Sequence, residues 1–276
     1  MNNLVKRTVF GALFLLIMVG GIIANRYTFA VLALVILVGM MNEYYRMTMK
    51  DRYKFSRFLA ILAGVILFLL VFLSRGFGVP GKFMILAMLP IFVVMINSLY
   101  VKDKTEYGMF ADVLTGLVYI AIPFTFMNVL VFNAEGQYNG VMLLCFYAII
   151  WASDVGAYCA GITLGRKWGG KLFPEVSPNK SWMGFWGGLV TAVLISMIFY
   201  WTGIFTFAWY HCIILAIVMN VFGVYGDLFE SQWKRYCCIK DSGKAIPGHG
   251  GFLDRFDSSL LAIPVGVIYL ILFNLI

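Results

Sequence analysis

The segment from Ser231 to Asp257 holds the densest group of chemically active side chains in this 276-residue sequence. It reads S-Q-W-K-R-Y-C-C-I-K-D-S-G-K-A-I-P-G-H-G-G-F-L-D-R-F-D, with five basic residues, one histidine and four glycines among its carboxylates. Lysine and arginine neutralise phosphate, and glycine lets backbone N–H groups approach an anion. Carboxylates hold Mg²⁺ while phosphate oxygens complete the ligand shell of the metal. The mixture therefore indicates a site for a polyphosphate with a divalent metal.

Three further carboxylates, Asp112, Asp154 and Asp227, lie in or at the edge of apolar stretches. An ionised side chain is costly there and by default marks a functional site. We expect Asp154 to form a buried polar site with Tyr158, one helical turn away among small residues. Asp112 is better explained as a helix-end residue that snorkels to the interface or pairs with a loop lysine. Glu230, one turn after Asp227, is expected to be a solvated or salt-bridged neighbour.

The segment E-V-S-P-N-K-S-W, from Glu175 to Trp182, supplies a lysine and hydroxyl groups where the next apolar stretch begins. The first turn of a helix carries unpaired N–H groups and partial positive charge, so Lys180 and Ser181 could hold an anion there. The alternative is that Ser181 is only the helix N-cap and Lys180 only a charge that sets the membrane topology.

The elements that must position these residues are membrane helices. The sequence is 62% hydrophobic and 12% charged, whereas about a quarter of the residues of a soluble domain are charged. A spanning helix needs roughly 20 apolar residues. Nine such stretches can be marked, at about 8–24, 28–41, 58–74, 84–100, 109–132, 139–161, 182–205, 207–227 and 258–276, and the second of them is short.

These stretches predict an all-α, polytopic transmembrane bundle of about nine spans. Residues 1–138 form an N-terminal group of transmembrane helices. Residues 139–276 form a catalytic group of transmembrane helices with cytoplasmic loops at 162–181 and 228–257.

The loop charges predict the orientation of the chain. With the N-terminus in the cytoplasm, eighteen lysine and arginine residues lie inside and only Arg26, Arg75 and Lys82 lie outside, as the positive-inside rule requires. The chemically active segment, with Asp154 and Asp227, then approaches the cytoplasmic face. We expect a multi-pass protein of the bacterial cytoplasmic membrane whose basic face attracts lipid headgroups. Nucleic acid is not an expected partner, because the charge is spread over short loops without a nucleic-acid-binding module.

The segment from Ser231 to Asp257 resembles the signature of the phosphatidate cytidylyltransferase family, also called CDP-diacylglycerol synthases. That signature is S-x-[hydrophobic]-K-R, four residues, K-D-x-[small], two residues, then [hydrophobic]-[P or G]-x-H-G-G-[hydrophobic]-x-D-R-[hydrophobic]-D. Every fixed position is present, and the one departure is Trp233, an aromatic residue where the family usually has an aliphatic residue, Met or Phe. The S-P-x-K-S and W-x-x-D-x-x-A-Y segments extend the resemblance over the C-terminal half, from Trp151 onward.

The resemblance implies an all-helical membrane enzyme that uses Mg²⁺ and condenses CTP with phosphatidic acid to give CDP-diacylglycerol and pyrophosphate. It leaves open whether a second metal ion takes part. It implies that Asp227 and Asp254 are metal ligands, and we group them with Lys180 as catalytic residues. The predicted substrate-binding residues are Ser181, Lys234, Arg235, Lys240, His249, Gly250, Gly251 and Arg255. The remaining candidates, which would orient basic residues or add ligands, are Asp154, Asp241 and Asp257.

Two other functions are weighed against this one. A CTP-dependent lipid kinase of the polyprenol type also uses CTP at a membrane face, but it would transfer the terminal phosphate. A secondary transporter would hold its substrate near the middle of the membrane between repeats, and the sequence shows no internal repeat. A homodimer remains open, because Gly161 to Gly165 and Gly184 to Gly188 have a spacing that packs helices within one chain or between two.

Overall fold

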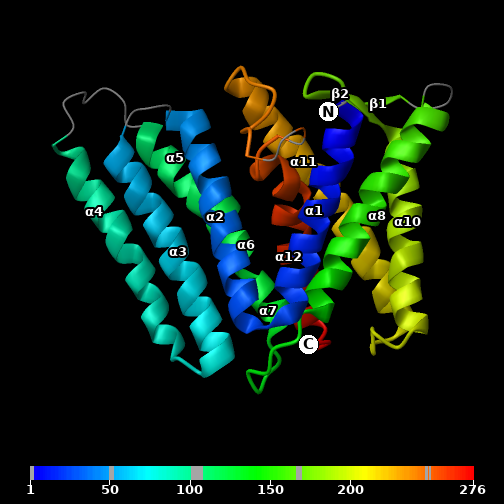
Figure 1. Cartoon of the computed structure of the whole chain (residues 1–276), viewed down its shortest axis with the longest axis horizontal. Helices are drawn as coiled ribbons and strands as arrows, with labels where there is room; N and C mark the ends of the chain where they lie inside the picture. Colours follow the sequence, from blue (N-terminus) through cyan, green and yellow to red (C-terminus); the bar gives the residue numbers. More distant parts are fainter. Residues whose placement is uncertain (1–2, 50–52, 101–107, 166–169, 246–247, 249) are drawn as a thin grey trace. The chain divides into compact units, whose positions relative to one another are not determined.

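The computed structural model describes residues 3–49, 53–100, 108–165, 170–245, 248 and 250–276, and most of them are helical (Figure 1). The helices of the first half are α1 (Asn3–Ala24), α2 (Arg26–Met49), α3 (Lys54–Phe77), η1 (Gly81–Ala87), α4 (Met88–Ser98), α5 (Gly108–Gly116), η2 (Leu117–Ala121), α6 (Ile122–Thr125) and α7 (Met127–Val131). The elements of the second half are α8 (Val141–Thr163), β1 (Lys171–Phe173), β2 (Ser177–Ser181), α10 (Trp182–Trp201), α11 (Trp209–Tyr236) and α12 (Leu253–Leu272).

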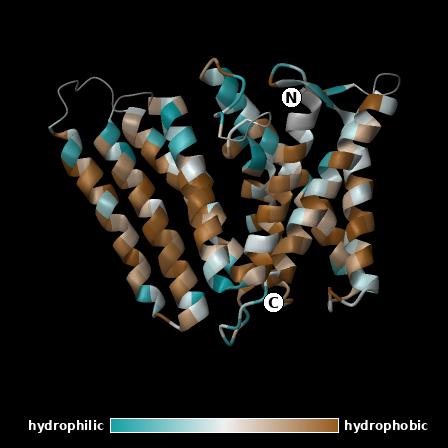
Figure 2. Cartoon of the chain, viewed as in Figure 1, coloured by the Kyte–Doolittle hydropathy of each residue, from teal (hydrophilic) through white to brown (hydrophobic). Residues whose placement is uncertain are grey.

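Eight helical stretches within the described ranges are long and apolar enough to cross a membrane. The short elements η1 and α4 form one of them, and α5 to α7 form another. The apolar part of α1, Thr8–Ala24, is shorter. Figure 2 shows α3 hydrophobic along its length, while the hydrophilic residues gather at helix ends and on β1 and β2. Together these elements match the nine predicted stretches, which confirms the all-α, polytopic fold.

The helices around the chemically active residues differ from the prediction at their ends. Helix α11 was expected to end near residue 227 but continues to Tyr236, and α12 begins at Leu253 rather than near residue 258. Hydropathy marks only the apolar part of a helix, and an i,i+4 ion pair between Glu230 and Lys234 supports the polar turns of α11. Much of the predicted loop 228–257 is therefore helix.

A small antiparallel hairpin precedes α10 and is an addition to the predicted all-helical bundle. Strand β1 pairs with β2 through Lys171 opposite Ser181 and Phe173 opposite Ser177. Pro174, directly after β1, suits the turn because its ring fixes φ. The hairpin delivers Lys180 and Ser181 to the start of α10.

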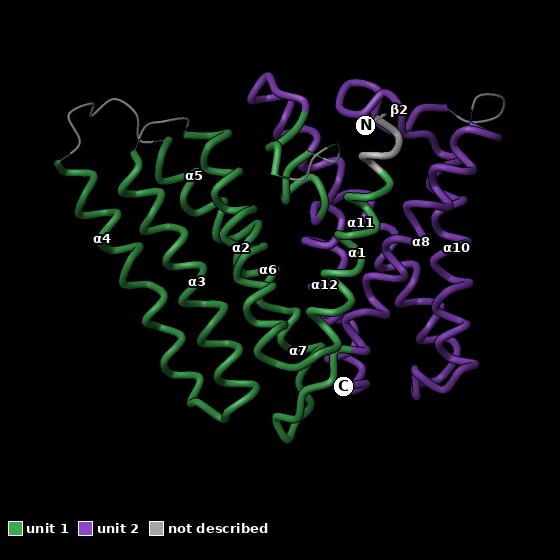
Figure 3. The backbone as a smooth tube through the Cα atoms, in the orientation of Figure 1, with its two compact units in different colours: residues 1–140, 241–255 green, residues 141–240, 256–276 purple. Residues whose placement is uncertain are grey.

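The chain divides into two compact units (Figure 3), which are described separately. Unit 1 comprises residues 1–140 and 241–255, and unit 2 comprises residues 141–240 and 256–276. The segment 241–255, which carries part of the predicted site, thus belongs with the N-terminal helices, and only the first turn of α12 is included in unit 1.

Unit 1 is built around α2, which packs against α1, α3 and α5. Its fully buried side chains include Tyr44, Tyr45 and Phe68. The Tyr45 hydroxyl donates a hydrogen bond to the Val113 carbonyl at 3.0 Å. This bond satisfies a buried polar group that would otherwise be costly in an apolar core.

Unit 2 depends on close packing of α8 against α10. A Cβ atom at Gly184 would lie 3.0 Å from the Ala157 carbonyl oxygen, and one at Gly188 would lie 2.9 Å from that of Ser153. These glycines therefore let two helices of the same chain approach each other. Of the two roles open to the Gly184 to Gly188 spacing, the structure shows the one within a single chain.

Candidate active site

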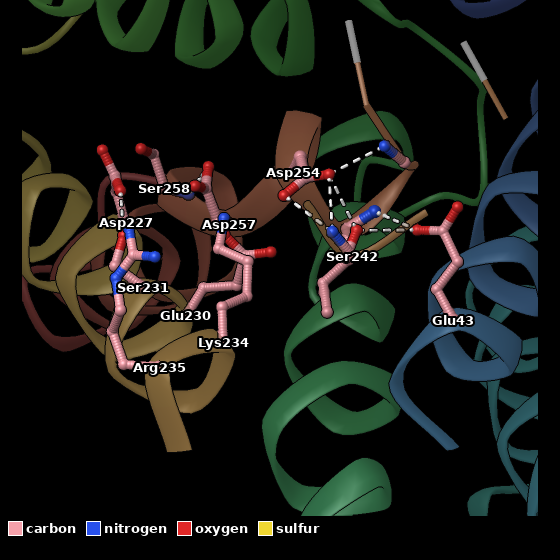
Figure 4. A network of polar contacts seen from close by, with 12 residues as sticks. Glu43, Asp227, Glu230, Ser231, Lys234, Arg235, Ser242, Asp254, Asp257 and Ser258 are labelled. Atoms are coloured by element: carbon pink, nitrogen blue, oxygen red, sulfur yellow. Dashed lines mark hydrogen bonds and ion pairs between the residues drawn. The ribbon is translucent and has the colours of Figure 1, made fainter. Parts of the chain in front are cut away.

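Asp254 lies in the first turn of α12 and is held by the segment that precedes it in unit 1. The Ser242 N–H contacts both carboxylate oxygens, Oδ1 at 3.2 Å and Oδ2 at 3.0 Å. Oδ2 also lies 3.0 Å from the Ser242 hydroxyl and 2.7 Å from the Gly251 N–H (Figure 4). Hydrogen bonds of this kind fix the orientation of a carboxylate before it binds a metal.

Gly250 has a backbone conformation that suits this arrangement. Its φ is +85°, in the region that residues with a side chain rarely adopt. A Cβ atom at this position would lie 2.5 Å from Asp254 Oδ2. Gly250 therefore allows both the turn and the close approach of its backbone to the Asp254 carboxylate. Its predicted part in substrate binding, within a close-approach turn, stays a prediction.

Glu43, on α2, is part of the same network and was not among the predicted site residues. Its Oε1 accepts the Phe252 N–H at 3.0 Å, and its Oε2 accepts the Leu253 N–H at 2.9 Å. Oε2 also lies 3.1 Å from the Ser242 hydroxyl, and the residue is only 8% exposed (Figure 4). The signal available in the sequence was a single acidic residue at the end of an apolar stretch.

Asp227, on α11 of unit 2, is paired with Lys180 of β2. The Lys180 ammonium lies 2.7 Å from Asp227 Oδ2 and donates to the Val224 carbonyl at 3.3 Å. The Ser231 hydroxyl donates to Asp227 Oδ1 at 3.2 Å. Two residues singled out from separate segments of the sequence are therefore in direct contact.

Ser181 is the N-cap of α10. Its buried hydroxyl accepts the Gly184 N–H at 3.1 Å, which is the usual way for a serine to satisfy one donor of a first helical turn. The structure thus shows the capping alternative, and nucleotide binding by this hydroxyl stays a prediction.

A second ion pair of α11 joins Glu230 and Lys234, whose charged atoms are 2.6 Å apart. The Glu230 side chain is fully buried and that of Lys234 is 11% exposed. The salt-bridged alternative for Glu230 is therefore the one observed, but it is formed inside the unit. Lys234 is thus already balanced by a carboxylate before any phosphate binds.

Asp257 and Asp154 lie near these acidic groups in unit 2. Asp257 accepts the Ser258 N–H at 2.7 Å and interacts electrostatically with Asp227, Glu230 and Asp154. Two of these four carboxylates, Asp227 and Glu230, are already paired with Lys180 and Lys234.

The prediction of a buried polar pair of Asp154 and Tyr158 is wrong, because both side chains are exposed, Tyr158 by 70%. The reason is that α8 turns its Ser153 and Gly156 face toward α10 and α11. Asp154 instead lines a small, partly open pocket beside Ser153, whose hydroxyl donates to Asn220 Oδ1 at 2.7 Å.

The other predicted residues are more exposed. Arg235 reaches the Val176 carbonyl with its Nε at 3.4 Å, while Lys240, Asp241 and Arg255 are exposed. His249 lies outside the described residues, as do the loop lysines expected to pair with Asp112. Exposed lysine and arginine side chains are accessible to a phosphate-bearing substrate that arrives from water.

The donor chemistry fits Mg²⁺. Within the part of the chain that the structure describes, no group of three or more acidic, histidine or cysteine side chains is arranged to hold a metal. Mg²⁺ does not require such a cage, because it is commonly bound by one or two carboxylates together with substrate phosphates and water. Asp227 and Asp254 each carry oxygen donors of that type, and their role as metal ligands stays a prediction.

Comparison with known proteins agrees with this chemistry. Residues 5–273 match the sequence model of the Cytidylyltransferase family. A phosphatidate cytidylyltransferase of Bacillus subtilis (strain 168) is 34% identical over 189 residues, which cover 68% of each chain. One of Rickettsia bellii (strain RML369-C) is 33% identical over 228 residues, covering 78% of this chain and 91% of the relative. One of Staphylococcus saprophyticus is 34% identical over 181 residues, covering 65% of this chain and 66% of the relative.

Proposed function

The chain belongs to the cytidylyltransferase family, and from this premise we propose that it transfers the cytidylyl group of CTP to phosphatidic acid. The products are CDP-diacylglycerol, a precursor in phospholipid biosynthesis, and pyrophosphate. The observation that carries the proposal is the family match from residue 5 to residue 273, which includes the complete signature from Ser231 to Asp257. Neither the family nor these relatives favours a lipid kinase or a transporter.

The reaction needs charge neutralisation more than a base. An oxygen of the lipid phosphate attacks the α-phosphorus of CTP, and the bond from that phosphorus to the pyrophosphate oxygen breaks. The attacking group is largely ionised at neutral pH, because the second pKa of a phosphate monoester is about 6. The barrier is the repulsion between two anions and the negative charge that builds up on pyrophosphate, which fixed cations and a metal ion reduce.

Asp227 and Asp254 are the proposed Mg²⁺ ligands, and each is oriented by hydrogen bonds within its own unit. When bound, Mg²⁺ would supply positive charge to the phosphate oxygens. We assign Lys180 to the triphosphate of CTP, since its ammonium lies beside the proposed metal ligand Asp227 and both side chains are partly exposed. The other proposed phosphate contacts are Lys234, Arg235, Lys240 and Arg255, with His249, Gly250 and Gly251 in the close-approach turn. Asp154, Asp241 and Asp257 stay candidates for orienting these cations.

The proposed location of the reaction is the cytoplasmic face of the bacterial cell membrane. The support is the excess of lysine and arginine in the loops on the side of the signature segment. CTP is available on that side, and the lipid substrate would come from the bilayer.

The test uses two labels in CTP. Purified protein in detergent, with phosphatidic acid and Mg²⁺, should place the α-phosphate label in the lipid and the γ-phosphate label in pyrophosphate. Removal of Mg²⁺ by a chelator should stop the formation of both labelled products. With a polyprenol added as an alcohol acceptor, label from the γ-phosphate in that lipid would instead establish a kinase. No lipid label from the α-phosphate would refute the proposed function.

A further inference from the structure

Glu43 acts as a distant cap for α12. The Phe252 and Leu253 N–H groups stand at the start of that helix, where no carbonyl of the helix can accept them. Glu43 accepts both, at 3.0 and 2.9 Å, across 209 and 210 positions of sequence. A carboxylate also suits the positive end of the helix dipole. The contact is therefore specific for an acidic side chain at this position of α2.

The loop is shaped around this carboxylate. A Cβ atom at Gly243 or Gly251 would overlap the Glu43 side chain. Two glycines of the segment thus make room for one buried carboxylate, which is 8% exposed. Burial without hydrogen bonds would be costly for a charged group, and here the segment from Ser242 to Leu253 provides them.

The same segment holds Asp254. The Ser242 hydroxyl lies 3.1 Å from Glu43 Oε2 and 3.0 Å from Asp254 Oδ2, and the Ser242 N–H contacts Asp254 as well. A hydroxyl has a single proton to donate, so it serves one carboxylate at a time, and backbone N–H groups hold both carboxylates throughout. An uninterrupted set of contacts therefore runs from α2 to the predicted metal ligand.

We propose that Glu43 is a positioning residue of the cytidylyl transfer reaction, which sets the orientation of the Asp254 carboxylate through Ser242 and the first N–H groups of α12. The inference rests on the proposed function, since it assigns Asp254 to the metal. Glu43 itself contacts neither substrate nor metal in this assignment. Loss of a partner that orients a metal ligand typically costs 10- to 100-fold in metal affinity or activity.

The experiment compares wild-type protein with Glu43→Gln and, as a matched control, Glu135→Gln, an exposed acidic residue of the same unit. The first readout is hydrogen–deuterium exchange of the peptide covering residues 250–255 in metal-free protein. The second is the Mg²⁺ concentration that gives half-maximal activity at saturating CTP and phosphatidic acid. Glu43→Gln should speed exchange in that peptide and raise the Mg²⁺ midpoint by about 10- to 100-fold, while Glu135→Gln should change neither.

The inference is overturned if exchange in Glu43→Gln equals that of wild-type protein. It is also overturned if exchange is faster but the Mg²⁺ midpoint is unchanged, because Glu43 would then only stabilise the fold. Should Glu43→Gln not fold, Ser242→Ala carries the same two readouts, and an unchanged midpoint would refute the link. Failure of the proposed function is a separate result, since it would show as absent product with wild-type protein.

Discussion

Replacing Lys180 by methionine removes the ammonium group that contacts Asp227 at 2.7 Å and keeps most of the apolar stem. The side chains of this ion pair are 23% and 35% exposed, and pairs that reach solvent contribute about 0.2–1 kcal/mol to stability. The melting temperature should therefore fall by no more than about 4 °C. Hydrogen bonds to charged groups contribute about 1.5–3 kcal/mol. If the ammonium binds the triphosphate, kcat/KM for CTP should fall roughly 10- to 150-fold.

The assay is Mg²⁺-dependent formation of CDP-diacylglycerol over a range of CTP concentrations, with thermal unfolding measured in the same detergent. Lys171→Met is the matched control, because Lys171 is an exposed lysine of the same hairpin. A raised KM alone would mean that Lys180 binds CTP equally in the ground and transition states, whereas a lowered kcat would mean that its contact strengthens during the reaction. If Lys180→Met kept kcat/KM within twofold of the Lys171→Met value, Lys180 would be only a topology charge.

Three further substitutions test the site. Asp254→Asn should lower turnover by about 10³-fold, because the metal is worth several kcal/mol of charge stabilisation; near-normal turnover in the CDP-diacylglycerol assay would exclude Asp254 as a ligand. Gly250→Ala places a Cβ on a backbone with positive φ, which costs about 1–3 kcal/mol, and crowds Asp254. Activity should therefore fall about tenfold, and full activity would contradict the close-approach turn. Glu230→Gln leaves the buried Lys234 without this carboxylate, which should lower the free energy of unfolding by about 3–5 kcal/mol and so lower the melting temperature. An unchanged melting temperature would show that the ion pair adds little to stability.

The apolar spans and the signature residues could be predicted from the sequence because each depends on local information. A hydrophobic stretch identifies a spanning helix whatever its neighbours are. Hydropathy does not detect the polar end of such a helix. For this reason α11 was expected to stop near residue 227, whereas it reaches Tyr236. The role of Ser181 as an N-cap is similarly local, and it was one of the two stated alternatives.

The contacts that need tertiary structure could not be predicted. Lys180 and Asp227 were both singled out, but their pairing requires the hairpin to pack on α11. Glu43 was not among the predicted site residues because its partners, Phe252 and Leu253, lie more than 200 positions away. The pairing of Asp154 with Tyr158 was wrong because one-turn spacing does not say which face of a helix is buried.

The long sequence separation between Glu43 and the start of α12 has a consequence for how the protein is made. At about 5–20 residues per second, the ribosome completes Glu43 roughly 10–40 s before it reaches Phe252. Until then α2 carries a carboxylate whose final partners do not exist, and Asp254 has not yet been made. The entropic cost of closing so long a loop grows only slowly with length, so the delay does not forbid the contact. The Asp254 carboxylate is thus assembled only after helices α1 to α11 have been made, and a chain truncated before α12 would lack this part of the predicted site.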